Sequence, residues 1–174
     1  MIISLCGFMG CGKSRVGTSL SKLLNYRLID LDNYIEEKYQ MTISEIFKDK
    51  GQEGFRLMES IALEEILENT LDENIILSLG GGSLNKEENR SLIKEKSHCF
   101  YLSANKNTLI RNLRNNQDKR PLLQGQDLEE AIDKLLEERI SIYEESGEYT
   151  IIVDGKHFEK VAIEMYNLIL FGQK

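Results

Sequence analysis

Cysteine is scarce in this 174-residue chain, and the three cysteines present, Cys6, Cys11 and Cys99, form no CxxC pair. An odd and widely spaced set argues against a disulfide framework and against a zinc site, and is typical of a reducing cytosol. No run approaches the ~18 consecutive apolar residues that a membrane-spanning helix requires. The apolar start "MIISLCGFMGC" lacks the positively charged leader of a signal peptide and is too short to be one. We therefore expect a soluble cytoplasmic protein with no membrane partner.

Basic residues are outnumbered, since 22 Lys and Arg stand against 29 Asp and Glu, for a net charge of −7. Nucleic-acid-binding domains usually present a basic face, so this balance argues against a nucleic-acid partner. It leaves room for an anionic small molecule, because a pocket can be basic inside an acidic protein. The length predicts a single domain over residues 1–174 with a real core, and we expect it to be a monomer.

Short apolar strands alternate with amphipathic helices along the chain. We expect strands at about 1–8, 26–32, 74–79, 98–103 and 149–154, and helices at about 13–24, 55–71, 107–116, 127–145 and 157–170. Four pairs with the spacing of a capping box predict helix starts: Asn33 with Glu36, Thr42 with Glu45, Asn85 with Glu88, and Asp127 with Glu130. Because the strands are continuously apolar, the predicted fold class is α/β, with a parallel sheet covered on both faces.

The stretch "GFMGCGKS" lies between the first strand and the first helix. Its pattern, Gly7-x-x-x-x-Gly12-Lys13-Ser14, is that of a phosphate-binding P-loop. Glycines let backbone N–H groups surround a phosphate, and the helix N-terminus adds partial positive charge. Lys13 can reach the β- and γ-phosphates of a nucleotide, and the Ser14 hydroxyl can bind Mg²⁺. A chance glycine-rich turn is the alternative, but strand, loop and helix stand in the required order.

The sequence argues against two classes of P-loop protein, the GTPases and the motor and transport ATPases. GTPases read guanine through Asn-Lys-x-Asp, and neither "NKEE" at Asn85 nor "NKNT" at Asn105 supplies the aspartate. Motor and transport ATPases place an aspartate at the end of an apolar strand near the loop. Asp154 ends such a strand, but this is the last strand and an expected sheet edge, so we interpret Asp154 as a solvated strand end. The P-loop is equally consistent with a small-molecule kinase.

Asp30 and Asp32 follow the second strand two residues apart, so an extended backbone would aim both carboxylates the same way. In α/β sheets, ligands collect at the carboxyl ends of strands. Asp30 could hold Mg²⁺ through water and Asp32 could accept a hydroxyl proton, although Asp32 could equally be a helix N-cap. Gly80-Gly81-Gly82, after the third strand, could form a wall against a flat, polyhydroxylated ring or simply a flexible turn.

Three arginines could serve an anionic substrate. Arg56 lies three residues before Glu59 and offers a fork for a carboxylate, although an isolated pair of this spacing is often a surface ion pair. Arg120 lies in the polar stretch 115–127 with the single proline, Pro121, and could cover a transferring phosphoryl group from a mobile lid. A rigid surface loop is the alternative there. Arg139 could point back toward the pocket or lie exposed on its helix.

Together these segments resemble the shikimate kinase family over nearly the whole chain. The resemblance rests on "GFMGCGKS", "DLD" at 30–32, Gly54-Phe55-Arg56 with Glu59, "GGGS" at 80–83, "RPLL" at 120–123, and Glu138-Arg139 with Tyr143. It implies a nucleoside-monophosphate-kinase-like fold whose five-stranded parallel sheet has the order 2-3-1-4-5, with substrate-binding helices at about 32–60 and a lid at about 115–127. It also implies transfer of the γ-phosphate of ATP to the 3-hydroxyl of shikimate, on the route to chorismate and the aromatic amino acids.

The resemblance also implies roles for matching positions. Residues implied to bind ATP are Gly10, Cys11, Gly12, Lys13, Ser14, Arg15, Arg114 and Arg120, with Mg²⁺ at Ser14 and Asp30. Residues implied to bind shikimate are Asp32, Arg56, Gly80, Gly81, Gly82 and Arg139. Among these, Arg56 and Arg139 would hold the carboxylate and Asp32 would be the base, with Lys13 and Arg120 as further catalytic residues.

The chain departs from the family pattern at three positions. Arg15 stands where threonine is usual, Ser141 where proline is common, and Arg114 lies about one position from the arginine that packs on adenine. Two other functions stay open: a sister kinase acting on another small polyol, such as the linear sugar acid gluconate, and a nucleotide-binding regulator without transfer activity. The combination of two arginines with a glycine triplet favours a carboxylated ring over the sugar acid.

Overall fold

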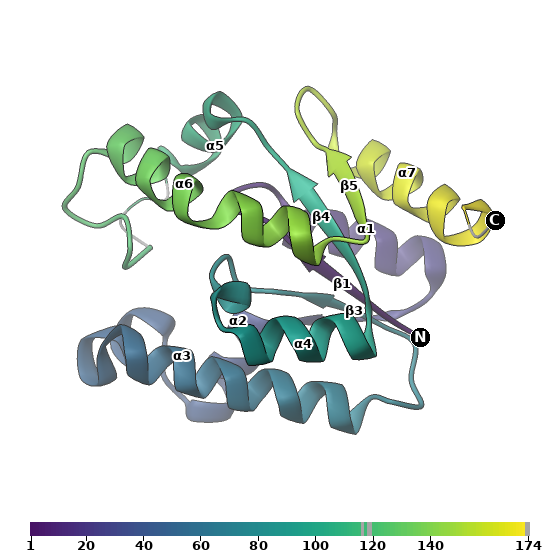
Figure 1. Ribbon diagram of the computed structural model, residues 1–174, viewed down its shortest axis with the longest axis horizontal. Helices are drawn as coiled ribbons and strands as arrows, with labels where there is room; N and C mark the ends of the chain where they lie inside the picture. Colours follow the sequence, from purple (N-terminus) through teal and green to yellow (C-terminus); the bar gives the residue numbers. More distant parts are fainter. Residues whose placement is uncertain (116, 118–119, 173–174) are drawn as a thin grey trace.

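A five-stranded parallel sheet forms the centre of the fold (Figure 1). The computed structural model describes residues 1–115, 117 and 120–172. The strands are β1 (Ile2–Cys6), β2 (Arg27–Asp30), β3 (Ile75–Ser78), β4 (His98–Ser103) and β5 (Tyr149–Ile152). Their order is β2-β3-β1-β4-β5 and all neighbouring pairs are parallel, which confirms the predicted fold class and strand order.

Helices cover both faces of the sheet, as predicted. They are α1 (Lys13–Leu24), α2 (Leu31–Tyr39), α3 (Ile43–Asn69), the short 3₁₀ helix η1 (Ser83–Asn85), α4 (Glu87–Lys96), α5 (Lys106–Leu113), α6 (Leu128–Ser146) and α7 (Phe158–Phe171). α1 and α7 pack against each other on one face, while α4 and α6 lie on the other, in front of the sheet in Figure 1. α3 packs against α2 and α4 below them in that view.

The two central strands form the deepest part of the core. Every residue of β1 and β3 is buried, because helices exclude water from both faces of the sheet. Ile3, Leu5 and Ile76 are fully buried, and burial of such a side chain contributes roughly 1.5–3 kcal/mol. β2, at the edge of the sheet, is less buried and ends at Asp30. The fully buried strands β1 and β3 thus form the centre of the sheet, and the more exposed edge strand β2 ends at the acidic residue Asp30.

Two of the four predicted helix caps are confirmed. Thr42 and Glu45 form a reciprocal capping box at the start of α3, and the Asp127 carboxylate accepts the backbone N–H groups of Glu129 and Glu130 at 3.0 Å each. Asp127 therefore fixes the start of α6 immediately after the polar stretch.

The other two predicted caps are wrong. α2 is capped three residues earlier by Asp30, and Glu36 instead accepts the backbone N–H of Ile43 at 2.7 Å, which ties α2 to α3. Asn85 is part of η1, so α4 begins at Glu87 without a side-chain cap. In both cases a side chain expected in the cap has another place: Glu36 binds the start of α3, and Asn85 belongs to η1.

α3 contains two helices that the sequence predicts as separate, one that starts after Thr42 and one at about 55–71. Gly51, with φ of 69° and ψ of −177°, interrupts the helix between the turn that begins at Ile43 and the long segment that ends at Asn69. The long helix thus begins earlier than the predicted Phe55. Its second half carries the Gly54-Phe55-Arg56 segment along the side of the sheet.

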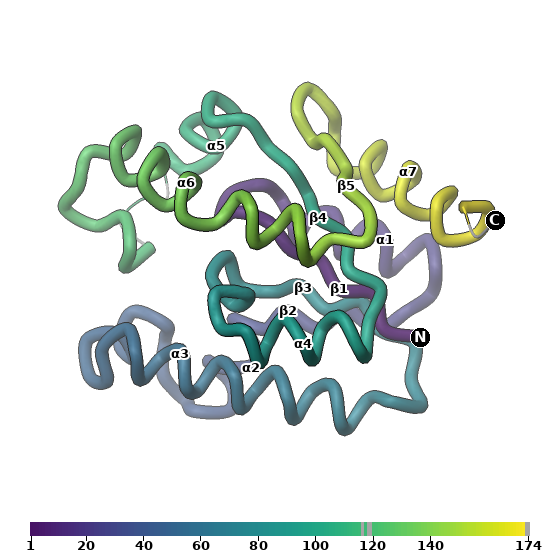
Figure 2. Tube along the Cα trace, in the orientation of Figure 1, coloured from purple at the N-terminus to yellow at the C-terminus, as the bar shows by residue number. Residues whose placement is uncertain are grey.

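The segment between α5 and α6 lies at the end of the molecule opposite both chain termini (Figure 2). α5 ends at Leu113, and residues 116, 118 and 119 of the predicted helix and lid lie outside the described residues. The side-chain amide of Gln117 donates to the carbonyl oxygens of Leu123 and Gln126 at 2.9 and 2.8 Å. The lid remains a prediction. Within the described ranges, no helix has both the length and the apolar character needed to cross a membrane.

Candidate active site

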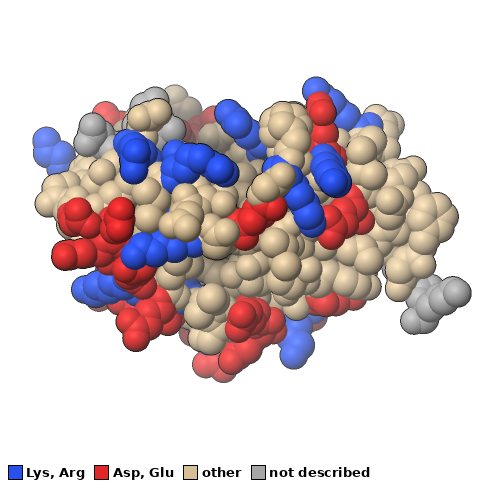
Figure 3. Space-filling model, turned by 90° about the horizontal axis from the view of Figure 1, so that it is seen from above, with Lys and Arg blue, Asp and Glu red and all other residues tan. Residues whose placement is uncertain are grey.

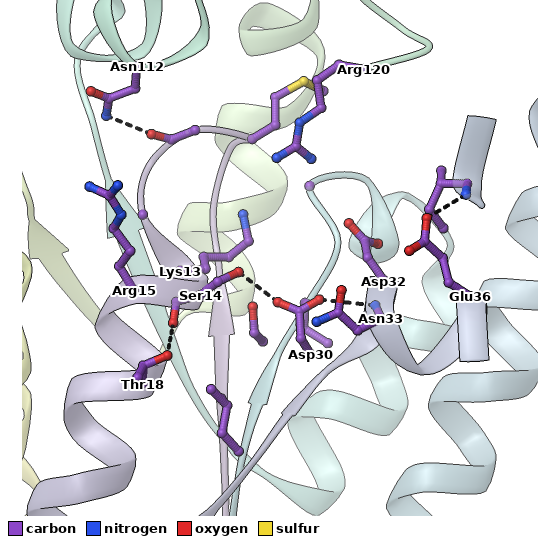
Figure 4. Close-up of a pocket in the computed structure, with 18 of the residues that line it drawn as sticks. Lys13, Ser14, Arg15, Thr18, Asp30, Asp32, Asn33, Glu36, Asn112 and Arg120 are labelled. Carbon is purple, nitrogen blue, oxygen red and sulfur yellow. Dashed lines mark hydrogen bonds between the residues drawn. The ribbon is translucent and has the colours of Figure 1, made fainter. Parts of the chain in front are cut away.

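A cleft of about 850 Å³ opens at the carboxyl ends of β1, β2 and β3 (Figure 4). One wall is the P-loop and the start of α1, and the opposite wall is the start of α2. Asn112 of α5 and Arg120 border it from above in the view of Figure 4. The position agrees with the rule that α/β sheets collect ligands outside the carboxyl ends of their strands.

The P-loop has the backbone shape of a phosphate cradle. Gly7, Gly10 and Gly12 have φ values of 139°, 81° and 101°, a region that other residues rarely adopt. The buried Lys13 ammonium donates to the carbonyl oxygens of Gly7 at 2.8 Å and Phe8 at 3.0 Å. A phosphate oxygen could replace these carbonyls as the acceptor. Cys11 is buried and is not among the residues that line the cleft, and its backbone N–H donates to the carbonyl oxygen of Phe8 at 3.2 Å.

Ser14 and Asp30 lie together at the base of the cleft. The Ser14 hydroxyl donates to Oδ2 of Asp30 at 2.7 Å, across the gap between α1 and β2. Mg²⁺ prefers oxygen ligands and is commonly held by one or two protein groups together with substrate phosphates and water. This oxygen pair fits that ion, although the described residues hold no group of three or more His, Cys, Asp or Glu that could bind a metal by themselves.

Asp32 points into the cleft from the first turn of α2 (Figure 4). Asp30 caps this helix, so the alternative that Asp32 is the N-cap is wrong. Burial raises the pKa of Asp32 to about 6, helped by the negative charges of Asp30 and Glu59 and opposed by the positive charges of Lys13 and Arg120. A carboxylate with a pKa near neutrality is suited to accept a proton from a hydroxyl.

A second, smaller cavity of about 60 Å³ adjoins the cleft. The two share Asp32, Gly81 and Arg120 among their lining residues. Arg56, Glu59 and Arg139 line only the smaller one. The geometry thus brings the acidic pair, the P-loop and the predicted carboxylate-binding arginines to one continuous space.

Charged side chains of both signs are interspersed on the face seen in Figure 3. Arg56 and Arg139 of the small cavity differ from these, because their side chains are largely buried. Arg56 forms an ion pair through Nη1 with Oε2 of Glu59, and its side chain is 12% exposed while that of Glu59 is 0% exposed. The surface ion-pair alternative for this pair is therefore wrong. Glu59 also accepts the Ser83 hydroxyl at 2.5 Å.

Arg139 is 2% exposed, which rules out the alternative of an exposed helical arginine. Its Nη1 donates to the carbonyl oxygen of Gly81 at 3.2 Å. In both Arg139 and Arg56 the Nε atom is buried and has no hydrogen-bond partner. Each guanidinium is therefore held through Nη1 and has no hydrogen-bond partner at Nε, so its Nε–Nη2 edge could receive a carboxylate through two parallel hydrogen bonds. Ser141 is exposed on the same helix.

The glycine triplet lies in a closely packed part of the site. A Cβ on Gly80 would lie 2.7 Å from Oε1 of Glu59, and one on Gly82 would lie 2.2 Å from Nη2 of Arg56. A Cβ on Gly81 would lie 3.0 Å from the backbone nitrogen of Met9 in the P-loop. None of the three glycines has a positive φ, so a left-handed backbone is not the reason for glycine at these positions. The absent side chains let the arginine, the carboxylate and the P-loop approach one another.

Not every predicted residue reaches the cleft. Arg15 lines it and lies 5.8 Å from the centre of the Phe158 ring, but Arg114 is exposed and lines a separate surface pocket beside Arg111. The carboxylate of Asp154 accepts the backbone N–H of Asn105 at 3.0 and 3.2 Å, and Asp154 does not line the cleft.

Two residues of the site had no assigned role in the sequence. The Asn112 side chain donates to the Gly10 carbonyl oxygen at 2.8 Å, and the Tyr143 hydroxyl donates to the Gly81 carbonyl oxygen. The spacing of Arg139 and Tyr143, one helical turn apart, was a signal that both side chains point the same way. No comparable pattern singles out Asn112.

Comparison with known proteins identifies the family of this chain. The shikimate kinase family model matches residues 9–169. A shikimate kinase of Dictyoglomus turgidum is 38% identical over 94% of each chain, and one of Vibrio parahaemolyticus is 37% identical over 96% of this chain and 95% of the relative. The solved structure of shikimate kinase from Acinetobacter baumannii in complex with shikimate has a TM-score of 0.93 and 33% identity, and the match covers 99% of this chain and 94% of that one. The chain therefore belongs to the shikimate kinase family.

Proposed function

We propose that this chain transfers the γ-phosphate of ATP to the 3-hydroxyl of shikimate, giving shikimate 3-phosphate and ADP on the route to chorismate. The observation that carries the proposal is the pair of buried guanidinium groups, each with an unpartnered Nε, beside Asp32 in a cavity that adjoins the P-loop cleft. A buried N–H without a partner is unfavourable, and a bound carboxylate would supply the missing acceptor. The A. baumannii relative, whose structure holds shikimate, supports the same acceptor.

On the donor side, backbone N–H groups of Gly10, Cys11 and Gly12 would surround the phosphates of ATP. Lys13 would exchange its backbone carbonyl partners for phosphate oxygens, and Arg120 would neutralise charge on the transferring group from above. Ser14 and Asp30 would hold Mg²⁺, which would supply positive charge against the negative charge of the phosphates. Arg15 would contact the nucleotide from the wall of the cleft, whereas the position of Arg114 gives it no such support.

On the acceptor side, the Nε edges of Arg56 and Arg139 would hold the carboxylate. Gly80, Gly81 and Gly82 would form the wall beside them, since all three line the small cavity. Fixed in this way, the acceptor would present a hydroxyl to Asp32, which would take its proton as the oxygen attacks the γ-phosphate. Every group named comes from one chain, so catalysis would need no partner subunit.

A coupled assay of ADP release tests the proposal with three acceptors: shikimate, shikimate methyl ester and gluconate. We expect turnover of shikimate, roughly 100-fold or more lower kcat/KM for the ester, because the buried arginines would be left without their anion, and little turnover of gluconate. Turnover of gluconate alone would assign the chain to a sugar-acid kinase. Binding of ATP without phosphorylation of any acceptor would assign it to a regulator.

A further inference from the structure

Gly81 lies at the junction of the two halves of the site. Its carbonyl oxygen accepts two hydrogen bonds from α6, one from the Tyr143 hydroxyl and one from Nη1 of Arg139 at 3.2 Å. Its α-carbon packs on the P-loop, where an added Cβ would lie 3.0 Å from the backbone nitrogen of Met9. One residue therefore contacts both the nucleotide loop and the helix that carries an acceptor arginine.

Tyr143 is held in a fixed position for this contact. It is 1% exposed, and its ring stacks on Tyr101 of β4 with a distance of 5.4 Å between the ring centres. Burial raises the pKa of the hydroxyl above its ordinary value, so the group remains a hydrogen-bond donor at neutral pH. The ring thus delivers a permanent O–H donor to a single acceptor, the Gly81 carbonyl.

Arg139 shares that acceptor but has a different task. Its Nη1 reaches the Gly81 carbonyl, while its buried Nε has no partner. In a guanidinium, the Nε–H and one Nη2–H are parallel and lie on the edge opposite Nη1. This edge can bind the two oxygens of a carboxylate as a fork. Arg139 lines the small cavity, and its bond to the Gly81 carbonyl uses only Nη1, so the Gly81 carbonyl that Tyr143 also binds fixes one end of the guanidinium.

We propose that Tyr143 is a positioning residue for the acceptor: its hydroxyl fixes the Gly81 carbonyl and thereby the direction of the Arg139 fork. The inference rests on the proposed function, because the carboxylate in the fork is that of the acceptor. Its effect is confined to the acceptor side. Removal of the hydroxyl should raise the KM for shikimate about three- to tenfold, as expected for one lost hydrogen bond, and leave the KM for ATP within about twofold.

The variant Tyr143→Phe tests this, since it keeps the stacked ring and removes one oxygen atom. Tyr149→Phe is the matched control. Tyr149 is the first residue of β5, stacks on Phe100 and lines neither cavity of the site. In the Arg139→Lys background, Tyr143→Phe should change the KM for shikimate less than about twofold, because the fork is already lost.

A second measurement does not depend on turnover. The ¹⁵N resonance of the Arg139 Nε–H, assigned by its absence in Arg139→Lys, should shift in free Tyr143→Phe protein and exchange faster with water, and should stay unchanged in Tyr149→Phe.

The outcomes separate the inference from the proposed function. A raised KM for shikimate with a shifted Arg139 resonance supports the positioning role. An unchanged KM for shikimate in an active enzyme overturns it, and so does an equal rise of both KM values, which would mean a general loss of structure. A shifted Arg139 resonance in a protein that does not phosphorylate shikimate would support the positioning of Arg139 and overturn the proposed function.

Discussion

Replacement of Asp32 by asparagine should make the free protein more stable and the enzyme far less active. Asp32 has a pKa of about 6 in the folded protein against an ordinary value of 3.8, so the folded state binds its proton more tightly than the unfolded chain does. Between these values stability falls as pH rises, because the folded protein must ionise an unfavourably placed carboxyl group. Two pKa units at about 1.4 kcal/mol each give a cost of about 3 kcal/mol at pH ~7.5.

The Asp32→Asn side chain would not bear this cost, since it has no charge. The variant would lose the favourable interaction of a carboxylate with the first turn of α2, which is worth about 0.3–1 kcal/mol. The net gain is about 2 kcal/mol at pH ~7.5, or a rise in Tm of roughly 4–8 °C for a domain of this size. At pH ~5 only about half of the ionisation cost has developed, so the gain should shrink to about 1 kcal/mol or less.

Thermal unfolding of both proteins at these two pH values, without substrates, measures this difference. In the same samples, kcat should fall about 10²- to 10⁴-fold while ATP binding stays nearly intact, as for the loss of a general base. The kcat/KM of the wild type should also decline below a pH of about 6, where Asp32 becomes protonated. A variant that is less stable at the higher pH, or one that keeps near-full activity, would refute this account of Asp32.

Three further substitutions address the other contacts of the site. Arg56→Lys should raise the KM for shikimate at least about tenfold and leave that for ATP nearly unchanged, because lysine breaks the fork; Arg90→Lys, outside the cavity lining, is the control. Asp30→Asn should raise the Mg²⁺ concentration for half-maximal rate roughly 10- to 100-fold while preserving the α2 cap, and an unaltered Mg²⁺ titration would remove Asp30 from the metal site. Gly82→Ala should lower stability by about 1–3 kcal/mol and raise the KM for shikimate, since its methyl group would displace the Arg56 guanidinium; equal KM values for variant and wild type would count against that clash.

The sequence predicted those features of the fold that depend on local patterns. The P-loop follows from glycines that must adopt positive φ and a lysine placed after them, and the structure has positive φ at Gly7, Gly10 and Gly12. The parallel sheet follows from continuously apolar strands separated by helices, and its order followed from the family resemblance. The caps at Thr42 and Asp127 depend only on neighbouring backbone groups, and both are confirmed.

Features that depend on distant contacts could not be predicted in the same way. The spacing of Asn33 and Glu36 is that of a capping box, yet Glu36 binds the N–H of Ile43 because α2 and α3 meet in the folded chain. The spacing of Arg56 and Glu59 is the same in a surface pair and in a buried one, and only the packing of Ser83 against Glu59 decides between them. No sequence pattern indicates which atoms a side chain would contact at the position of a glycine.

The free site combines unfavourable features of both charge signs that one acceptor can relieve together. Arg56 and Arg139 each leave a buried N–H without a partner, and Asp32 must ionise beside Asp30 and Glu59. A neutral ligand would leave the arginines unsatisfied, and an anion without a hydroxyl would leave the Asp32 carboxylate without a donor. A ligand with a carboxylate at one end and a hydroxyl at the other satisfies both, so these side chains favour a carboxylated, hydroxyl-bearing acceptor over other metabolites.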